Sequence, residues 1–169
     1  RLPTLMVVGA SNGLPEDEAL SALFDRFLLR VVCENVDDDQ LPQVLAAGWA
    51  YAVGSETETD LFSVQDIAHL QAQVQQVELE SCRVPFVQLI KRLRHAGISI
   101  SDRRAVKLQR VLAASAILAG RYCVNPTDFW VLNYIWESIP QQEILKTIVA
   151  GFIDDATDEE KAVANPASM

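Results

Sequence analysis

The stretch Leu23-Phe24-Asp25-Arg26-Phe27-Leu28-Leu29-Arg30-Val31 decides which fold this sequence predicts. Its first residues continue the apolar face of a short helix that begins at Pro15, and residues 27–33 predict a buried strand. Arg26 lies where helix and strand meet, so its guanidinium has a rigid support. Such a group stays charged and binds phosphate oxygens bidentately. The alternative is an exposed ion pair with Asp25 or a nearby acid, which contributes less than about 1 kcal/mol.

A second apolar run, residues 5–9, lies upstream of this stretch. It shows no polar alternation, which predicts a strand covered on both faces, as in a parallel sheet. Asn12 follows that strand at the rim where open α/β sheets bind ligands. Its carboxamide can donate and accept, so it could orient a water against a γ-phosphate. Ser11-Asn12-Gly13 equally fits a simple turn.

Helical patterns dominate after residue 60. Ser63 with Asp66 forms a capping-box pattern, Ser101 precedes the longest helix, and Asn125 followed by Pro126 starts another. The predicted fold class is therefore mostly α with a small parallel β remnant. We expect an α/β part over 1–60, a helical bundle over 61–150 and a partly disordered tail over 151–169. Helices are expected at 39–47, 63–77, 83–96, 102–120, 126–136 and 141–153.

The helix after Ser101 opens with Arg103 and Arg104. Helical spacing places Arg103, Lys107 and Arg110 on one stripe. Two cations near a helix N-terminus oppose the helix dipole, which suggests an anionic partner. A basic stripe is also what an ordinary solvated helix face shows.

Charge is unevenly distributed along the 169 residues. Residues 1–62 carry a net charge of −8 and residues 151–169 a net of −4, but residues 63–150 carry +3. Eight bases and one acid lie between Lys91 and Arg121, a local field that suits a phosphate-bearing ligand. The acidic whole argues against non-specific duplex binding, although a nucleic-acid adaptor acting through residues 91–121 stays an alternative.

The cysteines and the hydropathy of the sequence limit which classes of protein are possible. The three cysteines are isolated and only two histidines accompany them, so we expect reduced thiols in a cytoplasmic protein and no metal-ligand set. No apolar run is long enough to span a bilayer, and no signal sequence opens the chain.

The order of these segments resembles the MoxR branch of the AAA+ ATPases, with the RavA-type group as the nearest likeness. The resemblance implies that Asn12 is sensor 1 and that Arg26 is the arginine finger, acting on the neighbouring subunit. It implies that Arg103 is sensor 2, with Arg104 as the substitute, so both would bind nucleotide. Gly13 departs from the family, where Glu is common. The resemblance depends on Ala10-Ser11-Asn12-Gly13-Leu14-Pro15-Glu16, Phe24-Asp25-Arg26-Phe27-Leu28, Ser101-Asp102-Arg103-Arg104, and Gly120-Arg121 followed by Val124-x-Pro126-x-Asp128.

The resemblance further implies a ring, a hexamer in such proteins, that hydrolyses ATP with Mg²⁺ and remodels protein partners in a chaperone-like way. Such family members often act with von Willebrand factor A-domain (VWA) proteins and in metal-cofactor insertion. The sequence contains no G-x-x-x-x-G-K-[S/T] loop and no apolar strand ending in Asp-Glu, so these residues alone would not bind ATP or Mg²⁺. The resemblance implies a C-terminal fragment in which residues 61–150 form the helical lid, and we expect the missing parts to lie upstream. The competing hypothesis is a non-enzymatic helical interaction module without any nucleotide loop.

Overall fold

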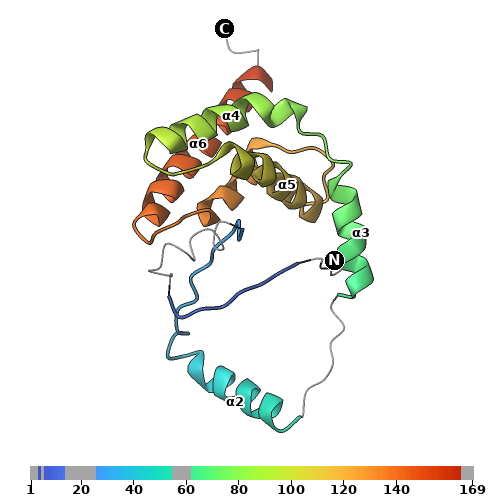
Figure 1. Ribbon diagram of the computed structural model, residues 1–169, viewed down its shortest axis with the longest axis vertical. Coiled ribbons are helices and arrows are strands. Elements are labelled where there is room, and N and C mark those ends of the chain that lie inside the picture. Colours follow the sequence, from blue (N-terminus) through green and yellow to red (C-terminus); the bar gives the residue numbers. More distant parts are fainter. Residues whose placement is uncertain (1–3, 5, 14–25, 55–61, 165–169) are drawn as a thin grey trace.

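The computed structural model describes residues 4, 6–13, 26–54 and 62–164, and it confirms the mostly helical class. In Figure 1 a bundle of α4, α5 and α6 is flanked by α3, while α2 lies apart from it. A short 3-10 helix, η1, packs against α5 and α6. The elements are α2 (Leu41–Ala52), α3 (Val64–Val74), α4 (Glu80–His95), α5 (Asp102–Leu118), η1 (Pro126–Tyr134) and α6 (Gln141–Ala164).

The hydrophobic core lies between α4, α5, η1 and α6. Phe129 of η1 is at its centre, with ring centroids 6.3 Å from Phe86 of α4 and 5.9 Å from Phe152 of α6. α4 contributes apolar residues at helical spacing to this core, and four of these are buried: Phe86, Leu89, Ile90 and Leu93. Close packing of this kind is what holds such helices together, because isolated helices of this length are marginal in water.

The helix starts follow the predicted caps. Ser63 and Asp66 form a complete capping box, and the Ser101 hydroxyl accepts a hydrogen bond from the Arg104 N–H. Gly120, with φ of +73°, allows the chain to turn after α5, a conformation that a side chain would strain.

Helix boundaries differ from the expectation at several places. α3 ends at Val74 instead of 77, and α2 begins and ends later than 39–47. The helix after Asn125 is a 3-10 helix that ends at Tyr134. Within the tail predicted over 151–169, the described residues up to Ala164 continue α6, because no Gly or Pro follows Gly151 there and Ala, Glu and Lys favour helix. The helix expected from Pro15 lies outside the described residues.

The two predicted strands are not formed in the part of the chain that the structure describes. Residues 6–13 and 27–33 are extended without strand pairing, and Met6, Val7 and Val8 are exposed. A strand needs neighbours that accept its backbone hydrogen bonds, and these described segments have none in a ladder. A single parallel bridge among the described residues, between Glu78 and Cys123, ties the start of α4 to the loop before η1. The two strand predictions, which are based on apolar character alone, are therefore wrong for the described residues, because such a pattern does not specify a pairing partner.

None of the described helices has both the length and the apolar character needed to cross a bilayer.

The buried and exposed leucines of α5 allow a matched stability test. Leu112 is 1% exposed and Leu118 is 77% exposed. We expect Leu112→Ala to lower the free energy of unfolding by about 3–5 kcal/mol, because it leaves a cavity in the core. Leu118→Ala, the control on the same helix, should change it by less than about 0.5 kcal/mol. Urea denaturation followed by tryptophan fluorescence measures both, and equal effects would contradict this packing.

Candidate functional site

Asn12 and Arg26, the two residues predicted in the N-terminal part, are both exposed. Asn12 lies in a bend, where the Ser11 hydroxyl donates to the Gly13 carbonyl at 2.7 Å. Arg26 occupies a turn that leads into the extended residues 27–33. Its alternative ion-pair partner, Asp25, lies outside the described residues. Both side chains are therefore accessible to a ligand or to another subunit.

The adjacent residues Arg103 and Arg104 have opposite environments. Arg103 is exposed in the first turn of α5, whereas Arg104 is 6% exposed. The Arg104 guanidinium forms an ion pair with Glu137 and donates to the Ile135 carbonyl at 2.6 Å. Successive side chains point about 100° apart around a helix, which explains the difference. Arg103 is thus available to an external anion, and Arg104 is engaged within the lid.

Arg30 reaches the same end of η1 from the N-terminal part of the chain. Its backbone N–H donates to the Tyr134 carbonyl at 2.7 Å, and its guanidinium donates to the Trp136 carbonyl. With the bond from Arg104 to Ile135, three consecutive carbonyls accept hydrogen bonds from two arginines. We call this arrangement, Arg30 and Arg104 on carbonyls 134–136, the carbonyl clasp. Figure 1 shows the segment after residue 26 approaching the orange η1.

The carbonyl clasp lies at the C-terminal end of η1: carbonyl 134 belongs to the last residue of the helix, and carbonyls 135 and 136 follow directly after it. The last carbonyls of a helix have no partner within it and carry the negative end of the dipole, so guanidinium groups suit them. Motifs and spacing in the sequence assign no role to Arg30. The available clue was its position, since a charged residue within the apolar run 27–33 must find a polar partner if it is buried.

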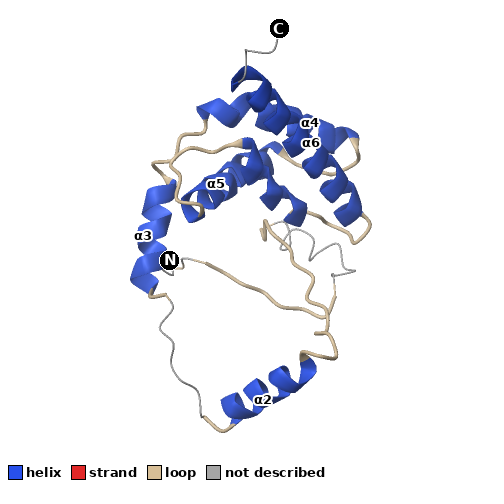
Figure 2. Ribbon diagram, turned by 180° about the vertical axis from the view of Figure 1, so that it is seen from behind, coloured by secondary structure: helices blue, strands red, loops and turns tan. Residues whose placement is uncertain are grey.

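The structure does not join Asn12, Arg26 and Arg103. Within the described ranges, no hydrogen bond or ion pair links any two of them. In Figure 2, seen from behind, the N-terminal segment runs below the bundle that carries α5.

The basic field between Lys91 and Arg121 divides into engaged and unengaged side chains. Arg94 forms an ion pair with Asp102 at 2.8 Å, and Arg92 lies 5.0 Å from the Phe152 ring and 3.5 Å from Asp155. Arg104 and Arg121 are also engaged. No hydrogen bond or ion pair within the described part of the chain occupies the remaining four bases, which are Lys91, Arg103, Lys107 and Arg110.

A buried carboxylate, Asp128, joins α5, the following loop and η1. It is 2% exposed and accepts hydrogen bonds from Arg121 at 2.7 and 2.9 Å and from the Ser115 hydroxyl at 2.7 Å. The Asn125 N–H donates to it at 3.0 Å, and the Trp130 indole donates to Ser115 at 3.1 Å. Arg121 and Asp128 belong to a motif that carried the family resemblance, and the sequence alone gave them no function.

This network shifts the pKa of both charged partners. Burial of Asp128 acts to raise its pKa, but the hydrogen bonds from Arg121, the Asn125 N–H and Ser115 outweigh it, so the pKa of Asp128 is lowered. The hydrogen bonds to Asp128 raise the pKa of Arg121. Both groups are therefore charged at neutral pH and form an ion pair within the protein.

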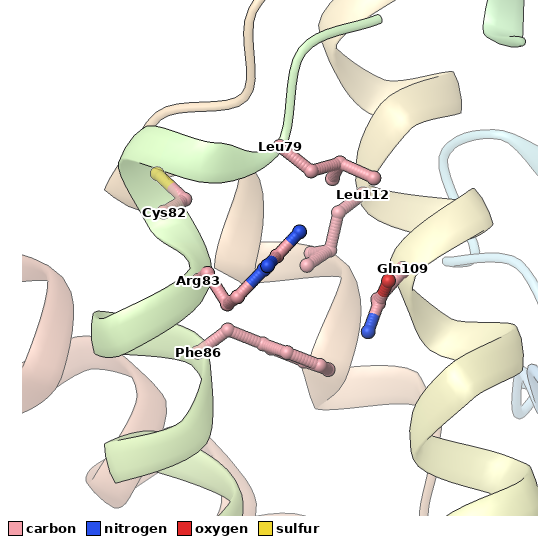
Figure 3. Close-up of a pocket in the computed structure, with 6 residues that line it drawn as sticks. All are labelled: Leu79, Cys82, Arg83, Phe86, Gln109 and Leu112. Carbon is pink, nitrogen blue, oxygen red and sulfur yellow. The ribbon is translucent and has the colours of Figure 1, made fainter.

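A small hollow between α4 and α5 is shown in Figure 3. None of the four predicted site residues lines it, and the Arg83 guanidinium pairs with Glu80 at 2.8 Å. Its lining is mainly apolar, so it does not provide phosphate ligands. The residues that line it are Leu79, Cys82, Arg83, Phe86, Gln109 and Leu112.

The described residues contain no group of three or more His, Cys, Asp or Glu side chains that could hold a metal ion. What the accessible side chains offer is positive charge and one amide, which suits stabilisation of phosphate charge more than proton transfer.

Comparison with known proteins defines the class. A sequence model described as "MoxR domain in the MoxR-vWA-beta-propeller ternary systems" matches residues 1–72. A second, described as "AAA lid domain", matches residues 84–149. The two matches follow each other along the chain, and the second covers α5, η1 and most of α4. The chain belongs to the MoxR family of AAA+ ATPases.

Two proteins of Methanocaldococcus jannaschii are similar to this chain. Uncharacterized protein MJ0812 is 27% identical over 143 residues, which is 84% of this chain and 37% of that protein. Uncharacterized protein MJ0079 is 28% identical over 151 residues, which is 88% of this chain and 38% of that protein. The chain thus spans about two fifths of the length of these curated relatives.

Asp128→Asn tests the buried network. The lowered pKa means that Asp128 stabilises the fold fully above its unfolded pKa, about 3.9, and that this contribution is lost as the pH falls through the folded value. We expect the free energy of unfolding of the variant to be about 3–5 kcal/mol lower than that of the wild type at pH 7. The difference in free energy of unfolding between the variant and the wild type should decrease as the pH falls from about 5 to about 3.

Asp102→Asn is the control, because Asp102 also pairs with an arginine but is 96% exposed. It should cost less than about 1 kcal/mol. Urea denaturation across this pH range measures both variants. A wild-type advantage over Asp128→Asn that stays constant with pH would show that the charge of Asp128 does not stabilise the fold.

Proposed function

We propose that this chain is the part of an ATP-hydrolysing motor that stabilises phosphate charge and couples hydrolysis to movement of the lid. The observation that carries the proposal is the order of the two matches, MoxR domain and then AAA lid, on a chain that exposes an arginine in each part. Arg26 lies within the first match and Arg103 within the second. An exposed guanidinium can bind a phosphate group with a small desolvation penalty, and it can donate two parallel hydrogen bonds to the phosphate oxygens.

The proposed roles divide between two nucleotide sites. Asn12 would position the attacking water and Arg103 would contact phosphate in the site of their own subunit. Arg26 would stabilise charge in the site of the next subunit, as an arginine finger does. Arg26 would act in another subunit, so this division does not require Arg26 to contact Asn12 or Arg103 within the described residues. Arg104, held by Glu137, would fix α5 so that Arg103 is presented outward.

ATP would be held mainly by another segment of the intact protein. These 169 residues contain no phosphate-binding loop, and the described ones contain no carboxylate cluster for Mg²⁺. We place those parts upstream of residue 1. Binding energy at the phosphates would rotate the lid, and the rotation would be the movement that does work on a partner.

The wider setting is proposed from family likeness. We propose a hexameric ring of the RavA-like kind, located in the cytoplasm, that remodels protein partners in a chaperone-like way. VWA-domain proteins are the partners we favour, and support comes from the name of the matching family model, which refers to MoxR-vWA-beta-propeller ternary systems. A role in metal-cofactor insertion would be one form of this remodelling.

Arg26→Ala in the intact protein tests the proposal. We expect ATP hydrolysis to fall by about 10³-fold or more, because the charge that develops on the transferring phosphoryl group loses its partner. Nucleotide binding and ring size should not change. A coupled phosphate-release assay, nucleotide titration and analytical ultracentrifugation measure the three quantities.

Arg110→Ala is the matched control, since Arg110 is also an exposed arginine without a partner among the described residues. It should retain wild-type hydrolysis. If Arg26→Ala hydrolyses ATP at the wild-type rate, Arg26 is not the arginine finger. An intact protein that binds no nucleotide at all would favour the non-enzymatic interaction module instead.

A further inference from the structure

Arg26 and Arg30 lie four residues apart but have different surroundings. Arg26 is exposed in a turn, whereas Arg30 is half-buried and donates two hydrogen bonds to carbonyls at and just after the end of η1. Four residues of chain span at most about 13 Å. The position at which Arg30 is held therefore limits where Arg26 can reach.

Arg103 and Arg104 repeat this arrangement on α5. Arg103 is exposed, and Arg104 is anchored to the Ile135 carbonyl and to Glu137. The carbonyl that Arg104 binds lies between the two that Arg30 binds, at residues 134 and 136. A displacement of this end of η1 therefore acts on both anchors at once.

We propose that Arg30 is a positioning residue that couples the two nucleotide sites which the chain serves. Nucleotide that engages Arg103 shifts α5, the shift passes through Arg104 and carbonyls 134–136 to Arg30, and Arg30 sets where Arg26 is presented to the neighbouring subunit. This inference rests on the proposed function. It assigns to the carbonyl clasp a regulatory role that neither family match describes.

The chemistry of the carbonyl clasp explains why an arginine is needed at position 30. One guanidinium can bind the Trp136 carbonyl while the backbone N–H of the same residue binds Tyr134, and its charge complements the end of a helix dipole. Lysine keeps the charge and one donor but lacks the planar fork. Glutamine keeps a donor and loses the charge. The carbonyl clasp should therefore be weaker in Arg30→Lys than in the wild type, and weaker still in Arg30→Gln.

Steady-state kinetics of the intact protein carrying Arg30→Gln or Arg30→Lys test the proposal. We expect Arg30→Gln to lower kcat at least about fivefold and to bring the Hill coefficient for ATP towards one, since coupling between sites is lost. The KM for ATP should stay within about twofold, because Arg30 does not touch nucleotide. Arg30→Lys should recover part of both losses. Arg110→Gln, an exposed arginine outside the carbonyl clasp, should behave as wild type.

Hydrogen exchange of the wild-type protein provides a test that does not depend on a variant folding. The Arg30 amide is bonded to the Tyr134 carbonyl, so the exchange rate of the peptide containing residues 27–33 reports the carbonyl clasp. We expect addition of a non-hydrolysable ATP analogue to change that rate at least about fivefold. Arg30→Gln should abolish the dependence on nucleotide.

The outcomes separate the inference from the proposed function. A wild-type protein that hydrolyses no ATP refutes the proposed function, and the inference with it. A wild-type protein that hydrolyses ATP with a nucleotide-independent exchange rate at residues 27–33 refutes the inference alone. If Arg30→Gln keeps the kcat and the Hill coefficient of the wild type, the inference alone is refuted. A loss of kcat in Arg30→Gln that is matched by an equal loss of nucleotide affinity also refutes the inference alone.

Discussion

The polar ends of a buried 3-10 helix constrain the rest of this structure. Five of the nine residues of η1 are buried, and the hydrogen bonds at its ends, from the Asn125 N–H to Asp128 and from the arginines to carbonyls 135 and 136, are partly or fully buried. An unsatisfied buried polar group costs about 1–3 kcal/mol, and side chains from other elements must therefore reach it. Asp128 and Asn125 satisfy the start of η1, and the carbonyl clasp satisfies its end. Arginine from three separate places, at positions 30, 104 and 121, completes the arrangement.

The same arginines organise the chemistry around the helix. In each part of the chain one arginine faces inward and a nearby one faces outward, Arg30 with Arg26 and Arg104 with Arg103. The inward member has fixed protein partners, and the outward member is exposed. Fixing a charged group through its neighbour is a way to preorganise it, which is how enzymes obtain electrostatic stabilisation without reorganisation during reaction. The function proposed above assigns both outward groups to phosphate.

The sequence predicted local features well and non-local ones poorly. Ser63, Ser101 and Asn125 act on the residues immediately after them, so their capping roles could be predicted from spacing. The strands expected at 5–9 and 27–33 depend on neighbours that a pattern does not specify, and residues 27–33 meet η1 instead. The site shows the same division. Exposure of Arg26 and Arg103 agrees with their predicted availability, but the roles proposed for them stay predictions. The anchoring roles of Arg30 and Arg104 could not be predicted, because their partners are mostly backbone carbonyls that carry no side-chain signature.

The proposed roles require arginines of this chain to serve two nucleotide sites, one of them in another subunit. Mixing two inactive forms of the intact protein tests this division. One form carries Arg26→Ala, and the other carries a substitution of the lysine in its proposed phosphate-binding loop. In mixed rings, some sites combine an intact loop with Arg26 from the neighbouring subunit, so ATP hydrolysis should reappear on mixing. Hydrolysis that stays absent in rings shown to be mixed would refute the division.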